Sequence, residues 1–552
     1  MKRVIFATLC ILMLTALLAS CKQDTPDVVK ESDLTPYGAY ENTLHVTIAK
    51  HNSPNPNMPD GMTITNNPYF DILKEKLNID LEILWLADNY DMQLALSIMT
   101  GDIPDLCLVK DHLLLKQLVD NDLIQPLDGL YEKCAGTPML ISYPSFPDDL
   151  WKPSMFDGRQ MALPSTVGGL QHALLWVRKD WLDALNLEPP KTLDEIIYVA
   201  QQFMQRDPGG NGPGNTVGIT TYGNWAFQGY NNAFGLEPIC YNYGAYPGAW
   251  MPDGSGGARY GSVQPEMKEA LIKIKSMYDT GVLDIESFEQ GWEQVWSTAH
   301  EGRSGLWFFP WNYPFGSMAF YENNPDAELI CYPAPLDAQG GYTYVSGALV
   351  DTWYTVRKGF QNPEALYKIL NVLFDVQQGR DEEGYERIKP IVDRGTDWTI
   401  AIPTGSFIMT TFDTIPVFSQ RVIDYINNGT TEFINEAGEP ARLEGNALYM
   451  AQQARDFSTG ANRTPTTWVS YVSRVLAGPQ TRTPADNPLQ AAYHYRTDSM
   501  VEMWDRLLLL ERDMYRQILT GEQPIDYFDE FVTQWYESGG RVINEEINST
   551  LR

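Results

Sequence analysis

Three short apolar stretches near the start of the chain decide its fold. They are Leu44–Lys50 (LHVTIAK), Ile79–Leu86 (IDLEILWL) and Asp105–Val109 (DLCLV). In the first stretch the apolar residues Leu44, Val46 and Ile48 occupy alternate positions. This is the period of a β-strand, whose successive side chains point to opposite faces of the sheet. The sequence therefore predicts three strands in this part of the chain.

Helical segments separate these strands. After a polar, Pro-rich loop, Pro68 opens a predicted helix that runs to Leu77. A second predicted helix runs from Tyr90 to Thr100 and ends at Gly101. Strands that alternate with helices at this spacing indicate a parallel sheet with right-handed crossovers. We therefore expect the chain to begin with an α/β domain.

More helices are predicted farther along the chain. Thr192 and Glu195 have the spacing of a capping box, which predicts a helix that starts there. Apolar residues at helical spacing predict another helix from Pro265 to Thr280, which Gly281 would end. Apolar stripes of the same kind continue through the last part of the chain. The C-terminal region is therefore expected to be helical.

Length and charge restrict the kind of protein. The chain has 552 residues, several times the ~150 of a typical domain, so at least two domains are expected. Its 71 Asp and Glu outnumber 40 Lys and Arg, and the net charge is −31. Because this charge repels phosphate backbones, we expect no nucleic-acid partner. The 15 Trp and 30 Tyr outnumber the 21 Phe, which favours binding surfaces made of rings with a hydrogen-bonding edge.

The first residues are typical of a signal peptide. Lys2 and Arg3 precede an apolar run from Val4 to Leu18. The run is shorter than the ~20 residues that a membrane-spanning helix needs, which argues against the alternative of an uncleaved membrane helix. It ends in Leu18-Ala19-Ser20-Cys21, which resembles the lipobox of bacterial lipoproteins, in which the cysteine is lipidated.

We therefore predict a lipoprotein. Residues 1–20 are the expected signal peptide, Cys21 carries the lipid, and residues 21–43 form a flexible tether. Stable anchoring needs two acyl chains or more. The mature protein is then expected on the cell membrane, facing the extracytoplasmic side.

Several stretches of the remaining chain resemble one protein family. The longest, Leu175–Glu195 (LWVRKDWLDALNLEPPKTLDE), is similar to the segment that enters the second domain of the extracellular solute-binding proteins of ATP-driven (ABC) importers. The others are Thr100–Leu106 (TGDIPDL), Leu123–Leu130 (LIQPLDGL), Asp157–Ser165 (DGRQMALPS), Tyr278–Asp284 (YDTGVLD) and the tail 531–544. In order and spacing they resemble the large lipoprotein branch of the carbohydrate-binding family, over most of the chain.

This resemblance implies a two-lobed, periplasmic-binding-protein-like (type II) fold. Two α/β lobes would be joined by hinge strands, with a helical C-terminal region and sugar held between the lobes. Residues 44–165 and about 350–400 would form the N-terminal lobe, and residues 166–345 and about 401–552 the C-terminal lobe. Hinge strands are expected near Leu163–Trp176 and Tyr342–Val356, and Ala401–Thr411 is the candidate for a third crossing.

The resemblance also implies a function without chemistry. The protein would bind a carbohydrate, expected to be an oligosaccharide, as a monomer and deliver it to the transmembrane permease subunits of an ABC importer. No cofactor is expected, and the sequence has no G-x-S-x-G, P-loop or H-E-x-x-H motif. Two alternatives stay open: a surface glycan-binding lipoprotein of mainly helical architecture, and a secreted polysaccharide-degrading enzyme, which needs only two carboxylates across a cleft.

Polar residues follow each of the three early strands. Ligands bind beyond the carboxyl ends of strands in open parallel sheets, so these residues are candidates for the ligand site. They are His51 and Asn52, Asp88 and Asn89, and Lys110 and Asp111. Each offers hydrogen-bonding groups suited to sugar hydroxyls. An ordinary polar surface loop is the alternative for each pair.

A tryptophan at a strand end is a further candidate. The run Gly305–Tyr313 (GLWFFPWNY) predicts a buried strand that Pro310 ends just before Trp311 and Asn312. An indole packs on the C–H face of a pyranose while an amide bonds its hydroxyls, so this pair suits a sugar. Further candidates are Trp225, after a predicted strand over 217–221, and Trp353 in the second hinge. A core position is the alternative for each tryptophan.

A Gly-rich loop partly follows a calcium-binding pattern. Asp207, Asn211 and Asn215 stand at positions one, five and nine of that pattern. Gly209 and Gly218 stand where positions three and twelve need side-chain ligands. Because two anionic ligands are missing, we favour a Gly-rich turn without metal over a calcium site.

Overall fold

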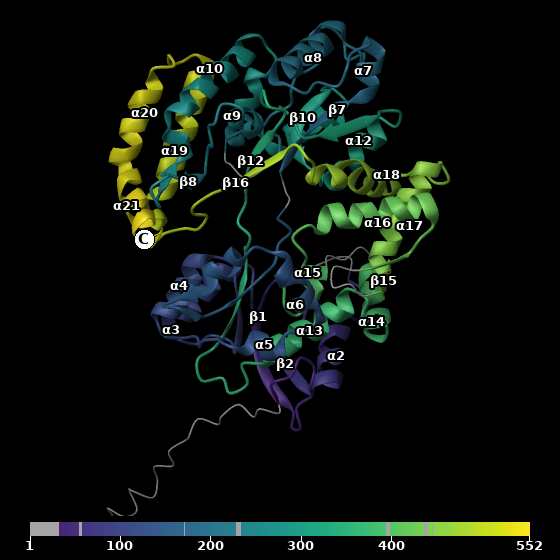
Figure 1. Ribbon diagram of the computed structural model, residues 1–552, viewed down its shortest axis with the longest axis vertical. Coiled ribbons are helices and arrows are strands. Elements are labelled where there is room, and N and C mark those ends of the chain that lie inside the picture. Colours follow the sequence, from purple (N-terminus) through teal and green to yellow (C-terminus); the bar gives the residue numbers. More distant parts are fainter. Residues whose placement is uncertain are drawn as a thin grey trace, which may run out of the picture.

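The computed structural model describes residues 33–53, 58–169, 172–227, 233–393, 398–434, 440–443 and 445–551. They form two lobes, one above the other in Figure 1, each built on a β-sheet with helices around it. The predicted signal peptide, Cys21 and the first part of the tether lie outside the described residues.

The lower lobe contains a five-stranded sheet with the order β2-β1-β3-β13-β6. Its strands are β1 (Leu44–His51), β2 (Ile79–Ala87), β3 (Leu106–Val109), β6 (Leu163–Pro164) and β13 (Trp353–Val356). β1 is parallel to β2 and to β3, whereas β13 is antiparallel to β3 and β6. The predicted parallel α/β start of the chain is confirmed.

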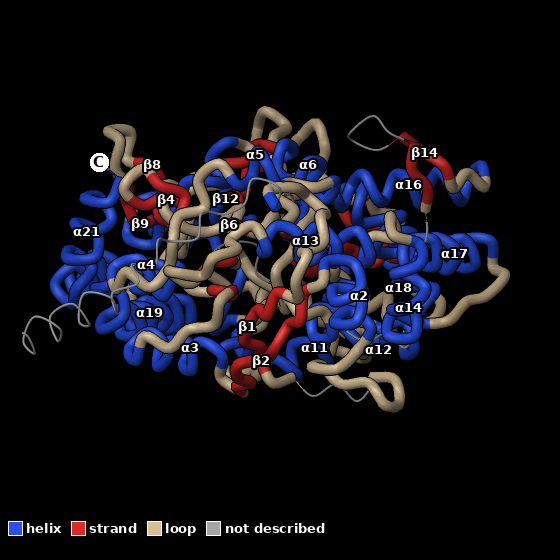
Figure 2. The backbone as a smooth tube through the Cα atoms, turned by 90° about the horizontal axis from the view of Figure 1, so that it is seen from below, coloured by secondary structure: helices blue, strands red, loops and turns tan. Residues whose placement is uncertain are grey.

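Helices cover this sheet on both sides. In Figure 2, α2 (Pro68–Leu77) and α13 (Ala365–Gln377) lie on one side of β1 and β2, and α3 (Tyr90–Thr100) lies on the other. Both predicted helices are found with the predicted bounds, because local caps fix their ends. The side chain of Asn67 accepts a hydrogen bond from the Tyr69 amide (3.1 Å), and Gly101 ends α3 with φ 74°. The lobe also contains α4 (His112–Asp120), α5 (Leu130–Cys134), α6 (Thr137–Ser142), α14 (Glu382–Asp393) and α15 (Trp398–Ala401).

The upper lobe contains a three-stranded antiparallel sheet, β10-β7-β11. Its strands are β7 (Ala173–Arg178), β10 (Leu306–Pro310) and β11 (Leu329–Tyr332). The strand predicted over 217–221 is wrong as a regular strand, since this segment forms only isolated bridges. Its amides alternate between two neighbours: Ile219 donates to the Val282 carbonyl and Thr220 to that of Leu306.

The predicted helices of the upper lobe are confirmed. The capping box of Thr192 and Glu195 begins α8 (Leu193–Arg206), and α10 (Pro265–Asp279) is followed by Gly281 with φ 73°. The C-terminal region is helical, as expected. The remaining helices are α7 (Lys179–Leu185), α9 (Glu237–Tyr241), α11 (Trp292–His300), α12 (Met318–Asn323), α19 (Asp498–Thr520), α20 (Tyr527–Trp535) and α21 (Arg541–Leu551). A small hairpin joins β8 (Trp250–Pro252) to β9 (Ala258–Tyr260).

A group of helices lies beside both lobes in Figure 1. It consists of α16 (Thr414–Asn428), α17 (Gly445–Thr459) and α18 (Pro465–Tyr471), with a hairpin of β14 (Glu432–Ile434) and β15 (Pro440–Arg442). Val422, Leu443, Ala451 and Ala454 form a small core between them. Trp468 of α18 joins the aromatic cluster around β10, which fastens the group to the upper lobe.

Each lobe has its own hydrophobic core, built from two separate stretches of chain. The first core takes residues from 40–163 and from 350–409, and the second takes residues from 173–334 and from 500–547. Ala401, Ile402, Phe407 and Met409 pack in the first core, although they are predicted in the C-terminal lobe. They do so because the chain returns to the end of β1, where the Lys50 side chain donates to the carbonyls of Ile400 and Ile402.

The crossings between the cores are tied to one another. After β6 the chain rises to β7, and after β12 (Tyr342–Ser346), which pairs with β16 (Asp486–Gln490), it descends to β13. The Ser165 hydroxyl donates to Asp351 (3.0 Å), which links these two crossings. Thr166 pairs with Met409, and the Thr410 amide donates to the Thr166 hydroxyl (2.8 Å), which links the third. Three adjacent segments of the chain therefore join the lobes.

The sequence leaves the pairing of the cysteines open. Cys107, Cys134, Cys240 and Cys331 are buried and free in the structure. In the part of the chain that the structure describes, no helix has the length and apolar character needed to cross a bilayer.

Candidate functional site

The carboxyl ends of β1 and β3 open onto a small cavity of about 130 Å³. His51 and Lys110, two of the predicted ligand-binding residues, line it together with Lys50, Tyr90, Ile400 and Ser406. They meet because β1 and β3 are parallel neighbours whose ends lie at the same edge of the sheet. In Figure 1, α15 lies at the upper end of the lower lobe, so the cavity faces the boundary between the lobes.

Lys50 is a site residue that the sequence analysis missed. Its side chain is buried, and its ammonium group donates to the carbonyls of Ile400 (2.9 Å) and Ile402 (2.7 Å). Burial lowers the pKa of Lys50 to about 7. A signal was present, because Lys50 continues the alternation of Leu44, Val46 and Ile48 and so belongs to the inward face of the strand.

Basic groups dominate the lining of this cavity. The Lys110 ammonium lies 5.8 Å from the centre of the Tyr90 ring, and Lys50 and His51 line the same cavity. An acidic neighbour is close, since burial raises the pKa of Asp91 while Lys110 opposes that shift. The cavity therefore offers nitrogen hydrogen-bond donors beside an aromatic ring.

The other predicted loop residues make local hydrogen bonds that join loops or cap helices. The Asn52 amide donates to Asp88 (2.7 Å), which joins the loops after β1 and β2. Asn89 caps α3 by accepting from the Met92 amide (3.0 Å), and Asp111 caps α4 by accepting from the Leu113 amide (2.8 Å). These four residues lie at the same edge of the sheet as the cavity but do not line it.

Trp311 lies directly after β10, as predicted, but its side chain is packed. It is 9% exposed and belongs to the aromatic cluster of the upper lobe. The guanidinium of Arg474 lies 4.6 Å from the centre of its ring, and Phe315 meets it edge-on. Asn312, the next residue, is exposed and precedes a short 3₁₀ turn over Tyr313–Gly316.

Trp353 and Trp225 are the two other candidate tryptophans. Trp353, in β13, is 1% exposed in the first core, where it meets His112 and Tyr495 (ring centroids at 5.4 and 5.6 Å). In this arrangement no face of its indole is left for a ligand. Trp225 ends a 3₁₀ turn over Gly223–Trp225, and its side chain lies outside the described part of the structure.

The predicted calcium-like loop is closed by its own hydrogen bonds. The Asp207 carboxylate accepts from the amides of Asn211 (3.0 Å) and Gly212 (2.8 Å) and from the Thr216 hydroxyl (2.6 Å), and the last of these does most to lower the pKa of Asp207. The Asn215 amide donates to the Asn211 carbonyl (2.8 Å). Among the described residues, no group of three or more His, Cys, Asp or Glu is arranged to hold a metal ion.

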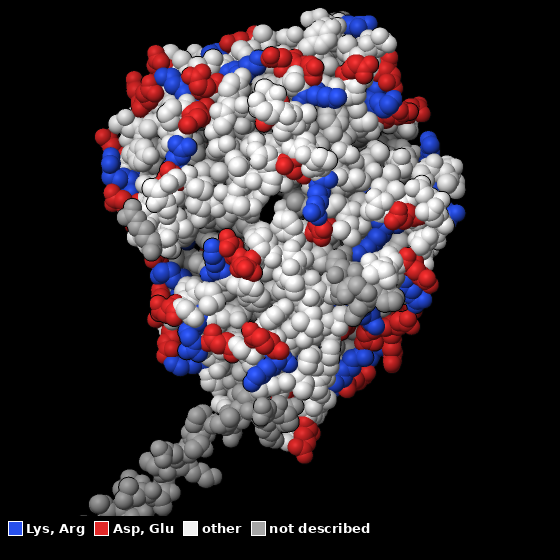
Figure 3. Space-filling view, viewed as in Figure 1, with Lys and Arg blue, Asp and Glu red and all other residues white. Residues whose placement is uncertain are grey.

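The two lobes have an opening between them. Figure 3 shows an opening between the two halves of the molecule, with charged side chains on both sides of it. Two α/β lobes with separate cores, joined by three hydrogen-bonded crossings around such an opening, define the fold of the two-lobed solute-binding proteins.

A solved structure of a known protein has the same fold. The structure superposes on a human-milk-oligosaccharide-binding, ABC-transporter-associated solute-binding protein from Bifidobacterium longum infantis with a TM-score of 0.59 and 14% identity, over 92% of this chain and 98% of that one. No protein-family model matches the sequence.

Two curated proteins match parts of the sequence. The fructooligosaccharide ABC transporter substrate-binding protein FusA of Streptococcus pneumoniae is 30% identical over 157 residues, 28% of each chain. The polygalacturonan/rhamnogalacturonan-binding protein YtcQ of Bacillus subtilis is 23% identical over 243 residues, 42% of this chain and 45% of that one. The matches thus span less than half the length of these relatives. Both relatives are named as binding proteins.

Proposed function

We propose that this protein is the extracytoplasmic solute-binding protein of an ABC importer and that its ligand is an oligosaccharide. The ligand would be held between the lobes, in contact with the cavity at the ends of β1 and β3. Closure of the lobes around the ligand would then present the complex to the permease. No bond of the sugar is broken in this function.

One observation carries the proposal: two lobes with separate cores are joined by three adjacent crossings, with an opening between them. Such a hinge lets a ligand bind both lobes at once, and the free energy of those contacts can drive closure. The names of the two sequence relatives supply the chemical class, since both bind oligo- or polysaccharides.

The two alternatives are a mainly helical glycan-binding lipoprotein and a polysaccharide-degrading enzyme. The mainly helical architecture is excluded by the five- and three-stranded sheets. A polysaccharide-degrading enzyme has no support from the relatives. It is tested directly by incubating the protein with glycans and analysing the products over time, because hydrolysis would shorten them.

The affinity test is a thermal-shift screen against a glycan panel. A ligand that binds only the folded state raises its stability by RT ln(1 + [L]/Kd), so a true ligand raises the melting temperature in a concentration-dependent way. Lys110→Met, at the cavity, should weaken binding of that ligand in calorimetry. Lys133→Met, an exposed residue of α5 that does not line the cavity, should leave it unchanged. A panel without any stabilising glycan would contradict the proposal.

We further propose that the protein is anchored through lipid on Cys21 and faces the extracytoplasmic side of the cell membrane. Cys21→Ser removes the thiol that would accept the lipid. We expect this variant to leave the detergent phase in phase separation, whereas the unchanged protein stays in it. Partition of Cys21→Ser into the detergent phase would contradict the lipid anchor.

A further inference from the structure

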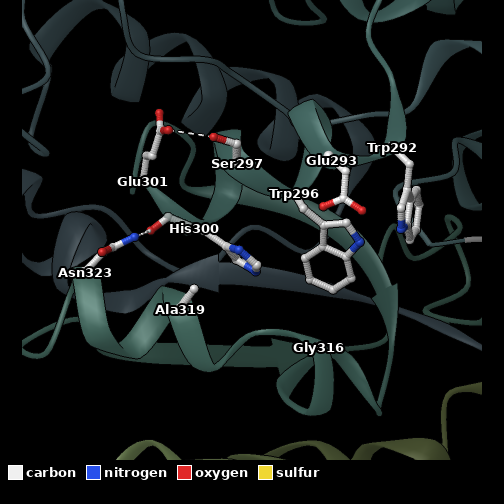
Figure 4. Close-up of a pocket in the computed structure, with 9 residues that line it drawn as sticks. All are labelled: Trp292, Glu293, Trp296, Ser297, His300, Glu301, Gly316, Ala319 and Asn323. Carbon is white, nitrogen blue, oxygen red and sulfur yellow. Dashed lines mark hydrogen bonds between the residues drawn. The ribbon is translucent and has the colours of Figure 1, made fainter.

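A groove separates α11 from α12 in the upper lobe (Figure 4). Its volume is about 620 Å³, within the ~300–1,000 Å³ of typical small-molecule sites. It shares no lining residue with the cavity at the ends of β1 and β3. None of the functions considered above uses it.

One wall of the groove is aromatic. Trp292, Trp296 and His300 follow one another at intervals of four residues, so they lie on one face of α11. Figure 4 shows their rings in a row that faces Gly316 and Ala319. The Trp292 side chain is 39% exposed, and the Trp296 indole stacks on Tyr313 behind it (centroids at 5.7 Å, planes at 15°).

A glycine leaves room for this wall. A Cβ atom at Gly316 would lie 3.0 Å from the Trp296 ring, closer than ordinary van der Waals contact. Ala319, the next lining residue of α12, has only a methyl group. At these two lining positions the groove therefore carries no side chain larger than a methyl group.

A second stripe of α11 supplies polar groups. Glu293, Ser297 and Glu301 are offset by one residue from the aromatic stripe and border the same groove. The Ser297 hydroxyl donates to Glu301 (2.6 Å), and Asn323 closes that end by donating to the His300 carbonyl (3.2 Å). Carboxylate oxygens are therefore available at both ends of the row of rings.

His300 is a buried polar group that lacks a partner. Its Nε2 atom is inaccessible to water and makes no hydrogen bond with any described residue, although its ring points into the groove (Figure 4). Buried polar nitrogens in native proteins are nearly always hydrogen-bonded. Because Nε2 is closed to a water-sized group in this arrangement, a ligand hydroxyl in the groove supplies the missing partner only when the imidazole rotates toward it.

These features together fit a sugar ring. A pyranose has an apolar C–H face, which packs on indole, and equatorial hydroxyls, which bond to carboxylates. The groove carries two carboxylates and no lysine or arginine among its lining residues, so it disfavours anionic sugars. We propose that the groove between α11 and α12 is a second carbohydrate site, specific for neutral pyranose units.

The test uses the protein labelled with 5-fluorotryptophan and observed by fluorine NMR. Trp292→Phe and Trp296→Phe identify two of the 15 tryptophan resonances. Cellobiose, maltose and lactose are the neutral probes and digalacturonic acid is the anionic probe, each titrated to its solubility limit. We expect a neutral disaccharide to shift both resonances, and digalacturonic acid to shift them only at much higher concentration.

Two variants locate the binding. Ala319→Phe fills the groove and should abolish the shifts of Trp292 and Trp296. Glu293→Gln should weaken binding about tenfold, since it removes a charged hydrogen-bond acceptor. The matched control is Glu322→Gln, because Glu322 is an exposed residue of α12 that does not line the groove.

Three results would overturn the proposal: no neutral probe shifts the two resonances, digalacturonic acid shifts them as readily, or the shifts persist in a folded Ala319→Phe protein. If Ala319→Phe fails to fold, equal affinities of Glu293→Gln and Glu322→Gln for the neutral disaccharide would overturn it. Calorimetry of oligosaccharides with Ala319→Phe separates this site from the interlobe one. Binding that survives there belongs to the proposed function and not to the groove.

Discussion

Arg474 joins two parts of the upper half of the molecule. Its guanidinium lies 4.6 Å from the centre of the Trp311 ring, after β10, and 4.8 Å from that of Phe418, in α16. Burial among these rings lowers the pKa of Arg474 to about 10, so the group stays charged at neutral pH. Desolvated cation–π contacts contribute about 2 kcal/mol. Trp311 thus has a structural role, because its ring packs against the half-buried guanidinium of Arg474.

At the scale of this residue we predict that Trp311→Ala destabilises the protein without ligand. The truncation removes a 9% exposed ring and leaves both a cavity and a poorly solvated guanidinium. We expect a loss of about 3–5 kcal/mol in the free energy of unfolding, measured with denaturant.

Trp292→Ala is the matched control for stability, because that indole is 39% exposed and its loss should cost clearly less. A Trp311→Ala protein with normal stability and glycan binding weakened by about 1–3 kcal/mol would contradict the structural role. It would place Trp311 in the ligand site instead.

At the scale of elements, Glu511 links α19 to the hairpin of β8 and β9. Its side chain is 2% exposed and accepts from the hydroxyls of Tyr260 (2.9 Å) and Tyr515 (3.1 Å). Burial raises the pKa of Glu511 from 4.5 to about 7. The hydroxyls of Ser262, Tyr260 and Tyr515 oppose this shift, but they do not fully replace the water that an ionised carboxylate would have.

This shift makes stability depend on pH. Between pH 4.5 and about 7 the unfolded chain has lost the Glu511 proton while the folded chain retains it. The unfolded state then binds fewer protons, so the free energy of unfolding falls as pH rises through this window, by at most about 1.4 kcal/mol per pH unit. Glu511→Gln should remove this fall, as measured by urea unfolding at a series of pH values.

The exposed Glu530 of α20 provides the comparison. Glu530→Gln should leave the pH profile of stability parallel to that of the unchanged protein. If the Glu511→Gln profile is also parallel, the carboxyl of Glu511 does not titrate in this window.

The loop after α8 yields a prediction about calcium. A Cβ atom at Gly209 would lie 2.4 Å from the Trp181 ring, and one at Gly218 would lie 2.4 Å from the Val282 carbonyl oxygen. Side-chain ligands at these two positions are therefore excluded sterically as well as by sequence. We expect a chelator such as EDTA to leave the melting temperature unchanged.

Asp207→Ala is the positive control for that measurement. It removes three hydrogen bonds that close the loop, so it should lower stability by about 1 kcal/mol or more whether or not calcium is present. A rise in melting temperature at micromolar calcium, lost in Asp207→Ala, would show a working calcium site.

Elements with local signals could be predicted from the sequence. The alternation of Leu44, Val46 and Ile48 and the capping box of Thr192 and Glu195 act within a few residues, and both elements have the predicted type. The candidate ligand site, in contrast, forms through contacts between residues that lie far apart in the sequence. Neither the carbonyl partners of Lys50 nor the burial of Trp353 between strands from different parts of the chain has a local signature.

At the scale of the whole molecule, the lobes touch beyond the three crossings. Tyr495, in the segment between β16 and α19, reaches the first core and stacks on His112 of α4 (centroids at 4.6 Å, planes at 24°). It also meets Trp353 (5.6 Å). A few residues away, the Lys116 ammonium lies 3.3 Å from Asp498, where both side chains are well exposed.

These two contacts should differ in their effect on lobe movement. Aromatic pairs contribute about 0.5–1.5 kcal/mol beyond their buried area, whereas exposed ion pairs contribute about 0–1 kcal/mol. Because a hinge equilibrium responds to any contact made in only one arrangement, Tyr495→Ala should let the ligand-free lobes spread and raise the radius of gyration in small-angle X-ray scattering. Binding of the glycan should weaken up to about tenfold, since closure must then restore the arrangement without the stacking. Lys116→Ala, across the same boundary, should change neither quantity measurably. If both variants scatter and bind as the unchanged protein does, the Tyr495 contact persists in every arrangement of the lobes and moves with them.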